Sequence, residues 1–158
     1  MACCGSGSWD ESFAPAGTFT HVTSGGDHTC ALATDGSIQC WGRDRDGRIS
    51  PPAGTFTQIE AGYDHTCALR ADGSIACWGG NEYGQVSAPS GTFTQIAAGR
   101  SQTCALRSDS SVDCWGRNDY GQSAAPAGAF VQLSAEGFDA CAVRSDQRLQ
   151  CWGLRVRR

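Results

Sequence analysis

The stretch GTFTQIEAGYDHTCALRADGSIACWGGNEYG, residues 54–84, recurs with small changes along most of the chain. Its first cysteine, Cys67, has counterparts 37 residues earlier, 37 residues later and 74 residues later. Its second cysteine, Cys77, and the Trp78-Gly79 pair recur at the same spacing. A period between about 20 and 50 residues is typical of solenoids, propellers and repeat arrays. The sequence therefore predicts four copies of one structural unit.

One copy has the pattern of a small antiparallel sheet. Residues 56–61 alternate large and small or polar side chains, as a half-buried strand does. Residues 66–70 and 74–78 are predicted to form a second and a third strand, joined by a hairpin signal at Asp72-Gly73. The copy shows no helical period. One such sheet cannot bury both of its faces, so neighbouring copies are expected to pack on one another.

The hairpin loop of this copy, residues 71–73, sets the register of its two cysteines. A loop of this length with a glycine in the left-handed region places Arg70 opposite Ser74, and therefore Cys67 opposite Cys77. This is a non-hydrogen-bonded pair, where antiparallel strands lie closest and within reach of a disulfide. The same arithmetic in every copy predicts four disulfides: Cys30–Cys40, Cys67–Cys77, Cys104–Cys114 and Cys141–Cys151.

Two alternatives to disulfides stay open. The cysteines could be reduced, buried thiols, or they could bind a metal. Structural zinc normally uses close Cys-x-x-Cys pairs, which do not occur in the chain. We therefore expect no metal and no other cofactor. Disulfides would mean an oxidising compartment, so the protein is expected to be secreted or at the cell surface.

The hairpin turn differs in sequence between the copies. Gly36 and Gly73 hold the left-handed position in the first two copies, whereas Ser110 and Gln147 hold it in the third and fourth. A side chain disfavours this backbone conformation. The last two turns are therefore expected to be looser or of a different type.

Length, composition and charge limit the class of protein. With 158 residues the chain is long enough for one domain with a core, and its 21 Gly, 10 Cys and 5 Trp suit short strands with tight turns. The net charge of -4 gives no basic surface for nucleic acid. No apolar run approaches the roughly 18 residues of a membrane span, and residues 1–5 lack the features of a signal peptide. We expect neither a nucleic-acid partner nor a membrane span, and the route of export is left open.

The period also divides the chain. Residues 1–17 are expected to form an N-terminal segment with a degenerate third strand. Residues 154–158 are expected to be a basic tail with three arginines, either solvated or bound to an anionic partner. The blade repeats between them are predicted at 18–54, 55–91, 92–128 and 129–153.

Two cysteines near the N-terminus lie outside the paired set. By the period, Cys3 corresponds to Cys40, but its copy has no first or second strand, and Cys4 stands where Trp41 would be. Cys3 is left with a strained bond to Cys4, a free thiol, or a bond to another chain. The last option would make Cys3 and Cys4 a site of intermolecular disulfide formation.

Three pieces of the second copy recur at constant offsets: HTCAL at 65–69, DGSI at 72–75 and CWGGNEYGQ at 77–85. They resemble the repeat of the regulator of chromosome condensation family, roughly G-x-x-H-x-x-A-L-x-x-D-G-x-V-x-x-W-G-x-N-x-x-G-Q. The short period and the Pro-Ala-Gly links are most similar to the bacterial members, including the propeller-type β-lactamase inhibitory protein. The likeness extends over about residues 15–153.

This resemblance implies an all-β fold, a β-propeller whose blades surround a central axis. Each blade would be a three- to four-stranded antiparallel sheet. The family typically closes a ring with more blades than the four copies found here, so a closed four-bladed ring and a partial propeller are both open. Most members of the family act by binding proteins on one face of the disc.

No pattern in the chain indicates catalysis. The equivalents of His28 and His65 are Gln102 and Asp139, so a hydrogen bond that stabilises the turn is a better interpretation than a catalytic or metal role. No Ser-His-Asp arrangement, phosphate loop or paired-carboxylate spacing stands out. We expect that the protein is not an enzyme. One tryptophan in each copy is interpreted as a blade-packing residue: Trp41, Trp78, Trp115 and Trp152.

The position that varies most among the copies lies just after the first predicted strand. It is occupied by Gly26, Tyr63, Arg100 and Phe138. These residues would line one rim of the disc. Variable residues on a constant scaffold are typical of the contact surface of a repeat protein, although an unconstrained loop varies too. The rim is therefore a candidate binding site.

Two functions are consistent with these patterns. The first is a secreted structural protein that assembles with copies of itself into a ring or a filament, because four blades leave blade faces and strand edges uncovered. The second is a protein-binding module, of the enzyme-inhibitor or adhesin type, that uses the rim to bind another protein. A nucleotide-exchange factor, another activity of the family, is disfavoured by the cysteines, the acidic pI and the small number of copies.

Overall fold

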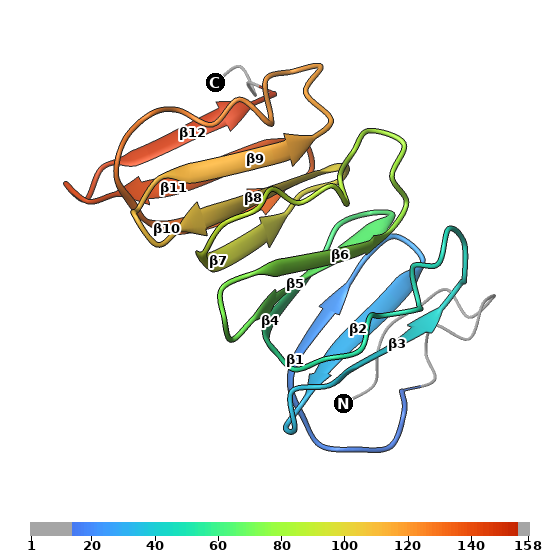
Figure 1. Cartoon of the computed structure of the whole chain (residues 1–158). Coiled ribbons are helices and arrows are strands. Elements are labelled where there is room, and N and C mark those ends of the chain that lie inside the picture. The colour runs from blue at the N-terminus through green and yellow to red at the C-terminus, as the bar shows by residue number, and fades with distance from the viewer. Residues whose placement is uncertain (1–13, 155–158) are drawn as a thin grey trace.

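The computed structural model describes residues 14–154, so Cys3, Cys4 and the arginines of the tail lie outside it. Its strands form four three-stranded antiparallel sheets, one for each repeat and here called blades 1 to 4. The blades follow one another in a curved row, with blades 1 and 4 at opposite ends (Figure 1). The prediction of an all-β, partial propeller is confirmed, with three strands in each blade.

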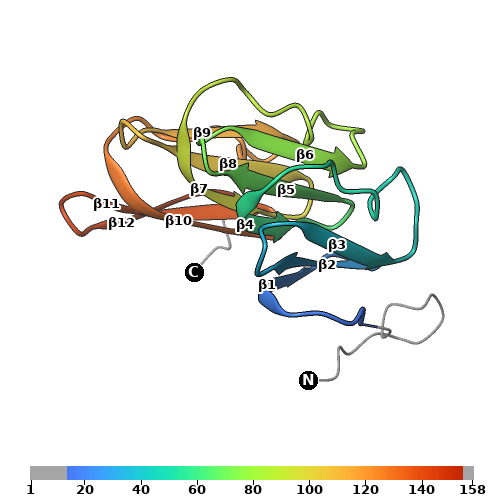
Figure 2. The same cartoon turned by 60° about the horizontal axis from the view of Figure 1, so that its bottom comes forward.

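The strands have the same order and nearly the same length in every blade (Figure 2). The first strand of each blade lies next to the first strand of the following blade. The first strands are β1 (Phe19–Ser24), β4 (Phe56–Ala61), β7 (Phe93–Ala98) and β10 (Phe130–Glu136). The second strands are β2 (His28–Ala33), β5 (His65–Arg70), β8 (Gln102–Arg107) and β11 (Asp139–Arg144). The third strands are β3 (Ile38–Gly42), β6 (Ile75–Gly79), β9 (Val112–Gly116) and β12 (Leu149–Gly153).

The hairpin between the second and third strands has the predicted register. Arg70 donates its backbone N–H to the carbonyl of Ser74 at 2.9 Å, and Cys67 lies directly opposite Cys77. The Cα atoms of the paired cysteines are 4.0 to 4.1 Å apart, as a non-hydrogen-bonded pair requires. Between residues 14 and 154 there are four disulfides: Cys30–Cys40, Cys67–Cys77, Cys104–Cys114 and Cys141–Cys151.

The last two hairpin turns have the same conformation as the first two, so the expectation of looser or different turns is wrong. Ser110 and Gln147 adopt φ angles of 72° and 69°, in the same left-handed region as Gly73 at 83°. An aspartate holds the turn: Ser111 donates its backbone N–H and its hydroxyl to Asp109, at 2.9 and 2.6 Å. These two bonds lower the pKa of Asp109. The register and the aspartate outweigh the preference of the turn residue, so Ser110 and Gln147 carry the strain.

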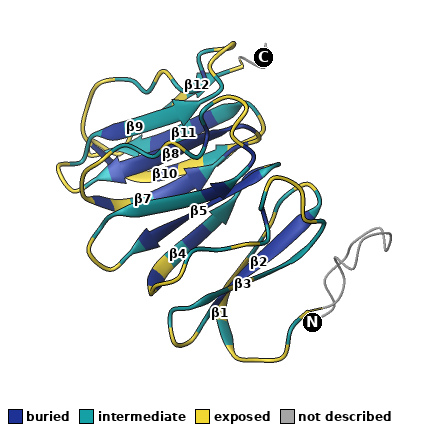
Figure 3. Ribbon diagram, turned by 45° about the vertical axis from the view of Figure 1, so that its right-hand side comes forward, coloured by how far each residue is buried: buried dark blue, intermediate teal, exposed yellow. Residues whose placement is uncertain are grey.

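Most of the core lies between blades rather than within them. The second strand of one blade presents Cys67 and Leu69 to Phe93 and Ile96 on the first strand of the next, and all four are buried. Figure 3 shows that burial is concentrated along the second strands. The other two interfaces repeat the arrangement with Cys30, Leu32, Phe56 and Ile59, and with Cys104, Leu106, Phe130 and Leu133.

The tryptophan of a third strand fixes the link that leads into its blade. The indole N–H donates to a backbone carbonyl of that link, and the ring joins the apolar cluster that holds the disulfide of the preceding blade. For Trp41, the equivalent carbonyl would be that of residue 11, which lies outside the described residues. The donors are Trp78, Trp115 and Trp152, and the acceptors are the carbonyls of Arg48, Gln85 and Gln122, at 3.0, 2.8 and 3.1 Å.

A glutamine on the first strand joins one blade to the next. The side-chain amide of Gln58 accepts the backbone N–H of Ile96 at 3.0 Å and donates to the carbonyl of the same residue at 3.3 Å. Gln95 makes the same pair of bonds with Leu133, at 2.9 and 2.8 Å. The bonded backbone groups lie on the open edge of the sheet, so each glutamine covers part of an edge strand. We call this two-bond contact the glutamine bridge.

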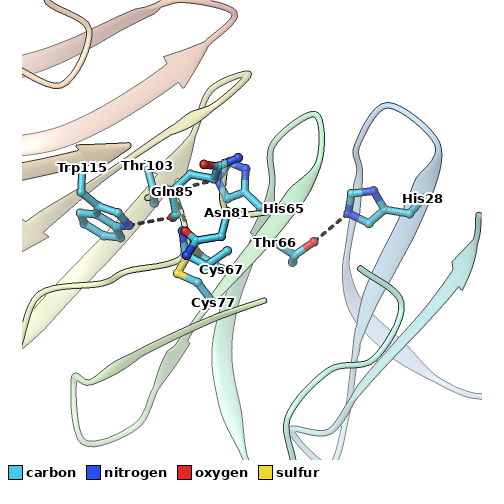
Figure 4. The surroundings of a disulfide bond; sticks show 10 residues. His28, His65, Thr66, Cys67, Cys77, Asn81, Gln85, Thr103 and Trp115 are labelled. Carbon is cyan, nitrogen blue, oxygen red and sulfur yellow. Dashed lines mark hydrogen bonds between the residues drawn. A yellow bond between two sulfur atoms is a disulfide. The ribbon is translucent and has the colours of Figure 1, made fainter. Parts of the chain in front are cut away.

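The two equivalent histidines also join blades. His28 Nε2 lies 2.8 Å from Thr66 Oγ1, and His65 Nε2 lies 2.7 Å from Thr103 Oγ1 (Figure 4). The expected hydrogen bond within the turn is therefore wrong, because the bond crosses to the second strand of the next blade. Burial lowers the pKa of both histidines to about 4. At the third interface glutamine replaces the histidine, as Gln102.

Acid should destabilise the protein, because both histidines have a lower pKa in the folded state than in the unfolded chain. Above about pH 6.5 both states hold neutral histidines. Between about pH 6.5 and the folded pKa near 4, only the unfolded chain binds protons, so the free energy of unfolding falls by about 1.4 kcal/mol per pH unit for each histidine. Denaturant unfolding across this range measures the loss. The variant H28Q/H65Q, which copies Gln102, should lose most of the dependence, and an unchanged dependence would contradict the assignment.

The strained turn gives a second prediction. Ser110→Gly should raise the free energy of unfolding by about 0.5 to 1 kcal/mol, because glycine relieves the left-handed strain. Gly73→Ser should lower it by at least as much, since the new Cβ would also lie 3.2 Å from the backbone nitrogen of Phe93. Thermal or denaturant unfolding compares both variants with the parent. A Ser110→Gly variant no more stable than the parent would show that the turn carries no strain.

Candidate functional site

Three of the candidate rim residues lie at equivalent places, just after the first strands of blades 1, 2 and 3. Gly26 donates its backbone N–H to the carbonyl of Tyr63 at 2.9 Å, and Tyr63 donates to Arg100 at 3.0 Å. Arg100 in turn donates to Gly137 at 2.6 Å. The series runs in one direction, from blade 1 to blade 4. It holds the turns at one end of the blades in a fixed arc.

The fourth rim residue is Gly137 rather than Phe138. Gly137 lies 37 residues after Arg100 and accepts its N–H, whereas Phe138 is the next residue along the chain. The assignment from sequence was therefore one residue late in blade 4. The ring of Phe138 nevertheless reaches the same place, because its centroid lies 5.5 Å from the guanidinium carbon of Arg100.

Arginines and aromatic rings alternate across this end of the blades. The guanidinium carbon of Arg100 lies 4.7 Å from the ring centroid of Tyr63. The guanidinium carbon of Arg117 lies 4.9 Å from the ring centroid of Tyr83 and 5.5 Å from that of Phe138. Phe138 thus lies between the two arginines. The set, here called the aromatic–arginine surface, consists of Tyr63, Tyr83, Arg100, Arg117, Tyr120 and Phe138.

The rings of this surface are accessible to solvent and yet held in place. Its three tyrosines are between 40% and 47% exposed. Tyr120 packs edge-on against Phe138, with the centroids 5.6 Å apart. A cation–π contact at an exposed site contributes about 0.5 to 1 kcal/mol. A connected series of such contacts therefore orders the side chains before any partner binds.

The glycine at position 26 makes room for the Tyr63 ring. A Cβ atom on Gly26 would lie 2.7 to 2.9 Å from three atoms of that ring, closer than side-chain atoms approach. Because Gly26 has no side chain, the ring can extend the surface toward blade 1.

An open hollow of about 430 Å³ lies beside the aromatic–arginine surface. It is lined by the ends of the first strands and the turns that follow them, including Tyr63, Arg100 and the exposed Glu136. The hollow therefore offers an aromatic ring, a cation and a carboxylate. A protruding side chain of a partner would fit beside these groups.

Half of the surface was not predicted from the sequence. Arg117, Tyr83 and Tyr120 lie in the links between blades, where no site residue was predicted. A signal was present, since Tyr83 and Tyr120 occupy the same position in successive copies. Their backbone N–H groups donate to the buried side chains of Gln85 and Gln122, each at 2.8 Å. These bonds hold both links in one conformation.

The two arginines of the surface differ in charge balance. Arg117 Nε donates to Asp119 at 2.6 Å, and this bond raises the pKa of Arg117. Between residues 14 and 154, Arg100 has no ion pair with a carboxylate. Its charge is therefore available to a carboxylate or a backbone carbonyl of a partner.

Between residues 14 and 154, no three His, Cys, Asp or Glu side chains are grouped so that they could hold a metal ion. Over the same residues no helix has the length and apolar character needed to cross a membrane.

The stacking of Arg100 on Tyr63 is testable by a double-mutant cycle. Tyr63→Leu, Arg100→Gln and the double variant should show a coupling of about 0.5 to 1 kcal/mol in the free energy of unfolding, because each single change removes the same contact. A second cycle pairs Tyr63→Leu with Arg45→Gln, since Arg45 is paired with Asp46 instead. This control should show no coupling. A coupling near zero in the first cycle would mean that the two side chains do not restrain each other.

The chain is similar to repeat proteins and to propellers of known structure. The family described as the regulator of chromosome condensation (RCC1) repeat matches residues 19–48, 56–85 and 93–122, together more than half of the chain. The ectodomain of the Physcomitrella patens receptor kinase CR4 is 27% identical with a TM-score of 0.74, over 89% of this chain and 42% of that chain. The ectodomain of the Arabidopsis thaliana receptor kinase ACR4 is 25% identical with a TM-score of 0.73, over 88% of this chain and 52% of that chain. No curated protein matches the chain.

A third similar structure is yeast RCC1 (Prp20), solved with Kap60. It is 18% identical with a TM-score of 0.73, over 85% of this chain and 43% of that chain, and this likeness concerns the fold alone. The chain spans about half the length of these solved structures, between 42% and 52%. The match of three successive repeats, on a structure built from the same three-stranded blades, shows that the chain belongs to the RCC1 repeat family.

Proposed function

We propose that the chain is a non-enzymatic protein-binding module that recognises its partner through the aromatic–arginine surface. The observation that carries this proposal is the alternation of exposed tyrosine and phenylalanine rings with arginine guanidinium groups at one end of the blades. Tyrosine and arginine are enriched among the residues that contribute most to protein–protein binding. An isolated exposed ring would carry no such argument, but six connected side chains form a continuous contact area.

Pre-ordering of the surface supports the same proposal. A flexible arginine loses about 0.5 to 1.5 kcal/mol of conformational freedom when it is immobilised at an interface. Arg100 and Arg117 already lie against rings, and the tyrosines are held by links and turns whose backbone is hydrogen-bonded. Part of the entropic cost of binding is therefore met by the fold. Yeast Prp20, solved bound to Kap60, is a protein of the same fold that binds a protein partner.

We also place the protein outside the cytosol, in an oxidising compartment. Four disulfides support this, because they persist in secreted and extracellular proteins and are rare in the cytosol. Two of the solved structures to which the chain is similar are ectodomains of receptor kinases. A secreted or cell-surface protein would meet its partner there.

Self-association is a second candidate function, favoured by a different observation. The outward faces of blades 1 and 4 carry apolar residues that are exposed, whereas their equivalents between blades are buried or half-buried. Such faces invite association, and contacts between unlike faces close a ring or grow a filament. The protein would then act as a structural component that assembles with its own copies. A bond through Cys3 or Cys4 to another chain is part of this proposal, although both residues lie outside the described region.

The protein-binding proposal is tested with a variant in which Arg100→Ala and Phe138→Ala are combined. The tagged chain is incubated with the extracellular proteins of its source, and captured proteins are quantified by mass spectrometry. We expect at least one partner to bind the parent, and its dissociation constant with the double variant to rise by more than about 10-fold. The reason is that both changes remove central side chains of the surface without touching the blade core.

The matched control is Arg45→Ala. It removes the same charge as Arg100→Ala from a residue whose side chain is 68% exposed and lies outside the surface. The control should bind the partner as the parent does. If the same proteins are captured equally by the parent, the double variant and the control, the aromatic–arginine surface does not bind them and the proposal fails.

A further inference from the structure

The three interfaces between blades share one chemistry, and the two ends of the row carry its separate halves. We call the face of a blade that meets the following blade its trailing face, and the opposite one its leading face. Between blades, a trailing face contributes a half-cystine and a leucine, and a leading face contributes a phenylalanine and an isoleucine or leucine. The trailing face of blade 4 and the leading face of blade 1 are not covered by any other described blade.

The trailing face of blade 4 has the residues of a blade interface but not their burial. Leu149 is 66% exposed, whereas its equivalents are half-buried in blades 1 and 2, as Ile38 and Ile75, and 8% exposed in blade 3, as Val112. Val143 is half-buried, whereas its equivalent Leu106 is buried. The half-cystine Cys151 is exposed as well. This face is therefore an apolar surface of the composition that the next blade covers elsewhere in the molecule.

The leading face of blade 1 has the complementary residues. Val22 is 58% exposed, while its equivalents Ile59, Ile96 and Leu133 are between 1% and 3% exposed. Phe19 is only half-buried, whereas the equivalent phenylalanines of the other blades are buried. An uncovered Val22 is thus the counterpart of residues that every internal interface buries.

The same two ends also carry the groups that would form a glutamine bridge. Gln132 of β10 occupies the position of Gln58 and Gln95, whose side chains make the glutamine bridges to Ile96 and Leu133. Unlike those two glutamines, Gln132 is exposed. A glutamine bridge reaches the first strand of the following blade, and no described blade follows blade 4. The side-chain amide of Gln132 therefore has no bridge partner within blades 1 to 4.

The backbone partner of such a bridge is present in blade 1. Val22 pairs with Ala31 in the same register as Ile96 pairs with Ala105. The backbone N–H and carbonyl of Val22 therefore lie on the open edge of β1, as those of Ile96 lie on the open edge of β7. An edge strand of this kind can donate its N–H to a glutamine oxygen and accept the glutamine N–H at its carbonyl, which are the two bonds of a glutamine bridge.

We propose that the trailing face of blade 4 in one copy binds the leading face of blade 1 in a second copy, with Gln132 bridging to the backbone of Val22 and Leu149 packing in the apolar contact. This inference rests on self-association, the second candidate function, and names the surfaces that carry it. A second copy is the occupant because the same chain supplies both halves of an interface that it already forms three times internally. The two surfaces differ, so the contact is head-to-tail.

Complementation of two blocked variants tests the head-to-tail contact. Both are made with Cys3→Ser and Cys4→Ser, so that no disulfide through these positions can hold copies together. Leu149→Arg blocks the trailing face of blade 4, and Val22→Arg blocks the leading face of blade 1, with like charges so that the two blocked faces repel each other. Light scattering should find an oligomer for the parent and, for each variant alone, a monomer of about 16.6 kDa. A mixture of the two variants should form a 1:1 dimer and nothing larger, because one intact interface is left between them.

A further pair of variants tests the glutamine bridge. Gln132→Ala should weaken self-association by about 10- to 100-fold, the loss expected for two hydrogen bonds. The control is Val131→Thr, which changes the neighbouring exposed residue to the threonine found at Thr57 and Thr94 and should leave association unchanged.

The outcomes separate the two levels of the proposal. A parent that stays monomeric at high concentration would overturn both self-association and this interface. An oligomer that survives Leu149→Arg and Val22→Arg would leave self-association standing and overturn the interface. Variants that are folded, as judged by their disulfides and circular dichroism, but fail to combine with each other would overturn the head-to-tail arrangement.

Discussion

The structure depends on the contact between the disulfide-bearing strand of one blade and the phenylalanine-bearing strand of the next. A two-stranded hairpin is marginally stable at best, and a sheet of three strands needs an apolar face that is packed. The apolar faces of these blades are packed against the neighbouring blades. The disulfide closes a short hairpin, with a sequence separation of 10, and by chain entropy this contributes about 3 kcal/mol. Cys67, one half of this disulfide, also lies in the buried cluster between blades. The cross-link therefore shapes the hairpin and supplies the surface on which the neighbouring blade packs.

The parts of the fold that follow from local chemistry were predictable from the sequence. The fixed spacing predicted the four copies, and the alternation of side chains predicted strands within each copy. The hairpin loop predicted the pairing of Cys67 with Cys77. The conformation of Ser110 was not predictable from its own preference, because the register and the turn aspartate impose it. The partner of His28 was missed because Thr66 lies 38 residues away, and no local pattern marks a bond between copies.

The aromatic–arginine surface was predicted in part, and the limit is again physical. Tyr63 and Arg100 were found because one position varies on a repeated scaffold. Arg117, Tyr83 and Tyr120 were missed because they lie in the links, and the links meet the turns only once the blades are arranged in a curve. The repeated residues therefore fix how the blades are spaced. The neighbours of a variable residue follow only from that arrangement of blades.

The interfaces keep their apolar contact while their polar contacts change. At the first two interfaces, His28 and His65 form hydrogen bonds with threonines. At the third interface, Gln102 replaces the histidine and Ala140 replaces the threonine. Similarly, the buried link residue is Arg48 at the first interface and glutamine at the next two. Arg48 is 2% exposed and pairs with Asp64 at 3.1 Å, so its charge is balanced locally. The apolar contact is common to all three interfaces, and more than one polar solution fits around it.

The backbone series through Gly26, Tyr63, Arg100 and Gly137 has a direction, because each N–H donates to the following blade. This direction gives the molecule a polarity, with chemically distinct ends. A whole repeat could be gained or lost by gene duplication or deletion while neighbouring blades keep their apolar contact and the backbone series, provided that the orientation is kept. The number of blades is therefore free to change during evolution, whereas the spacing between neighbouring blades is not.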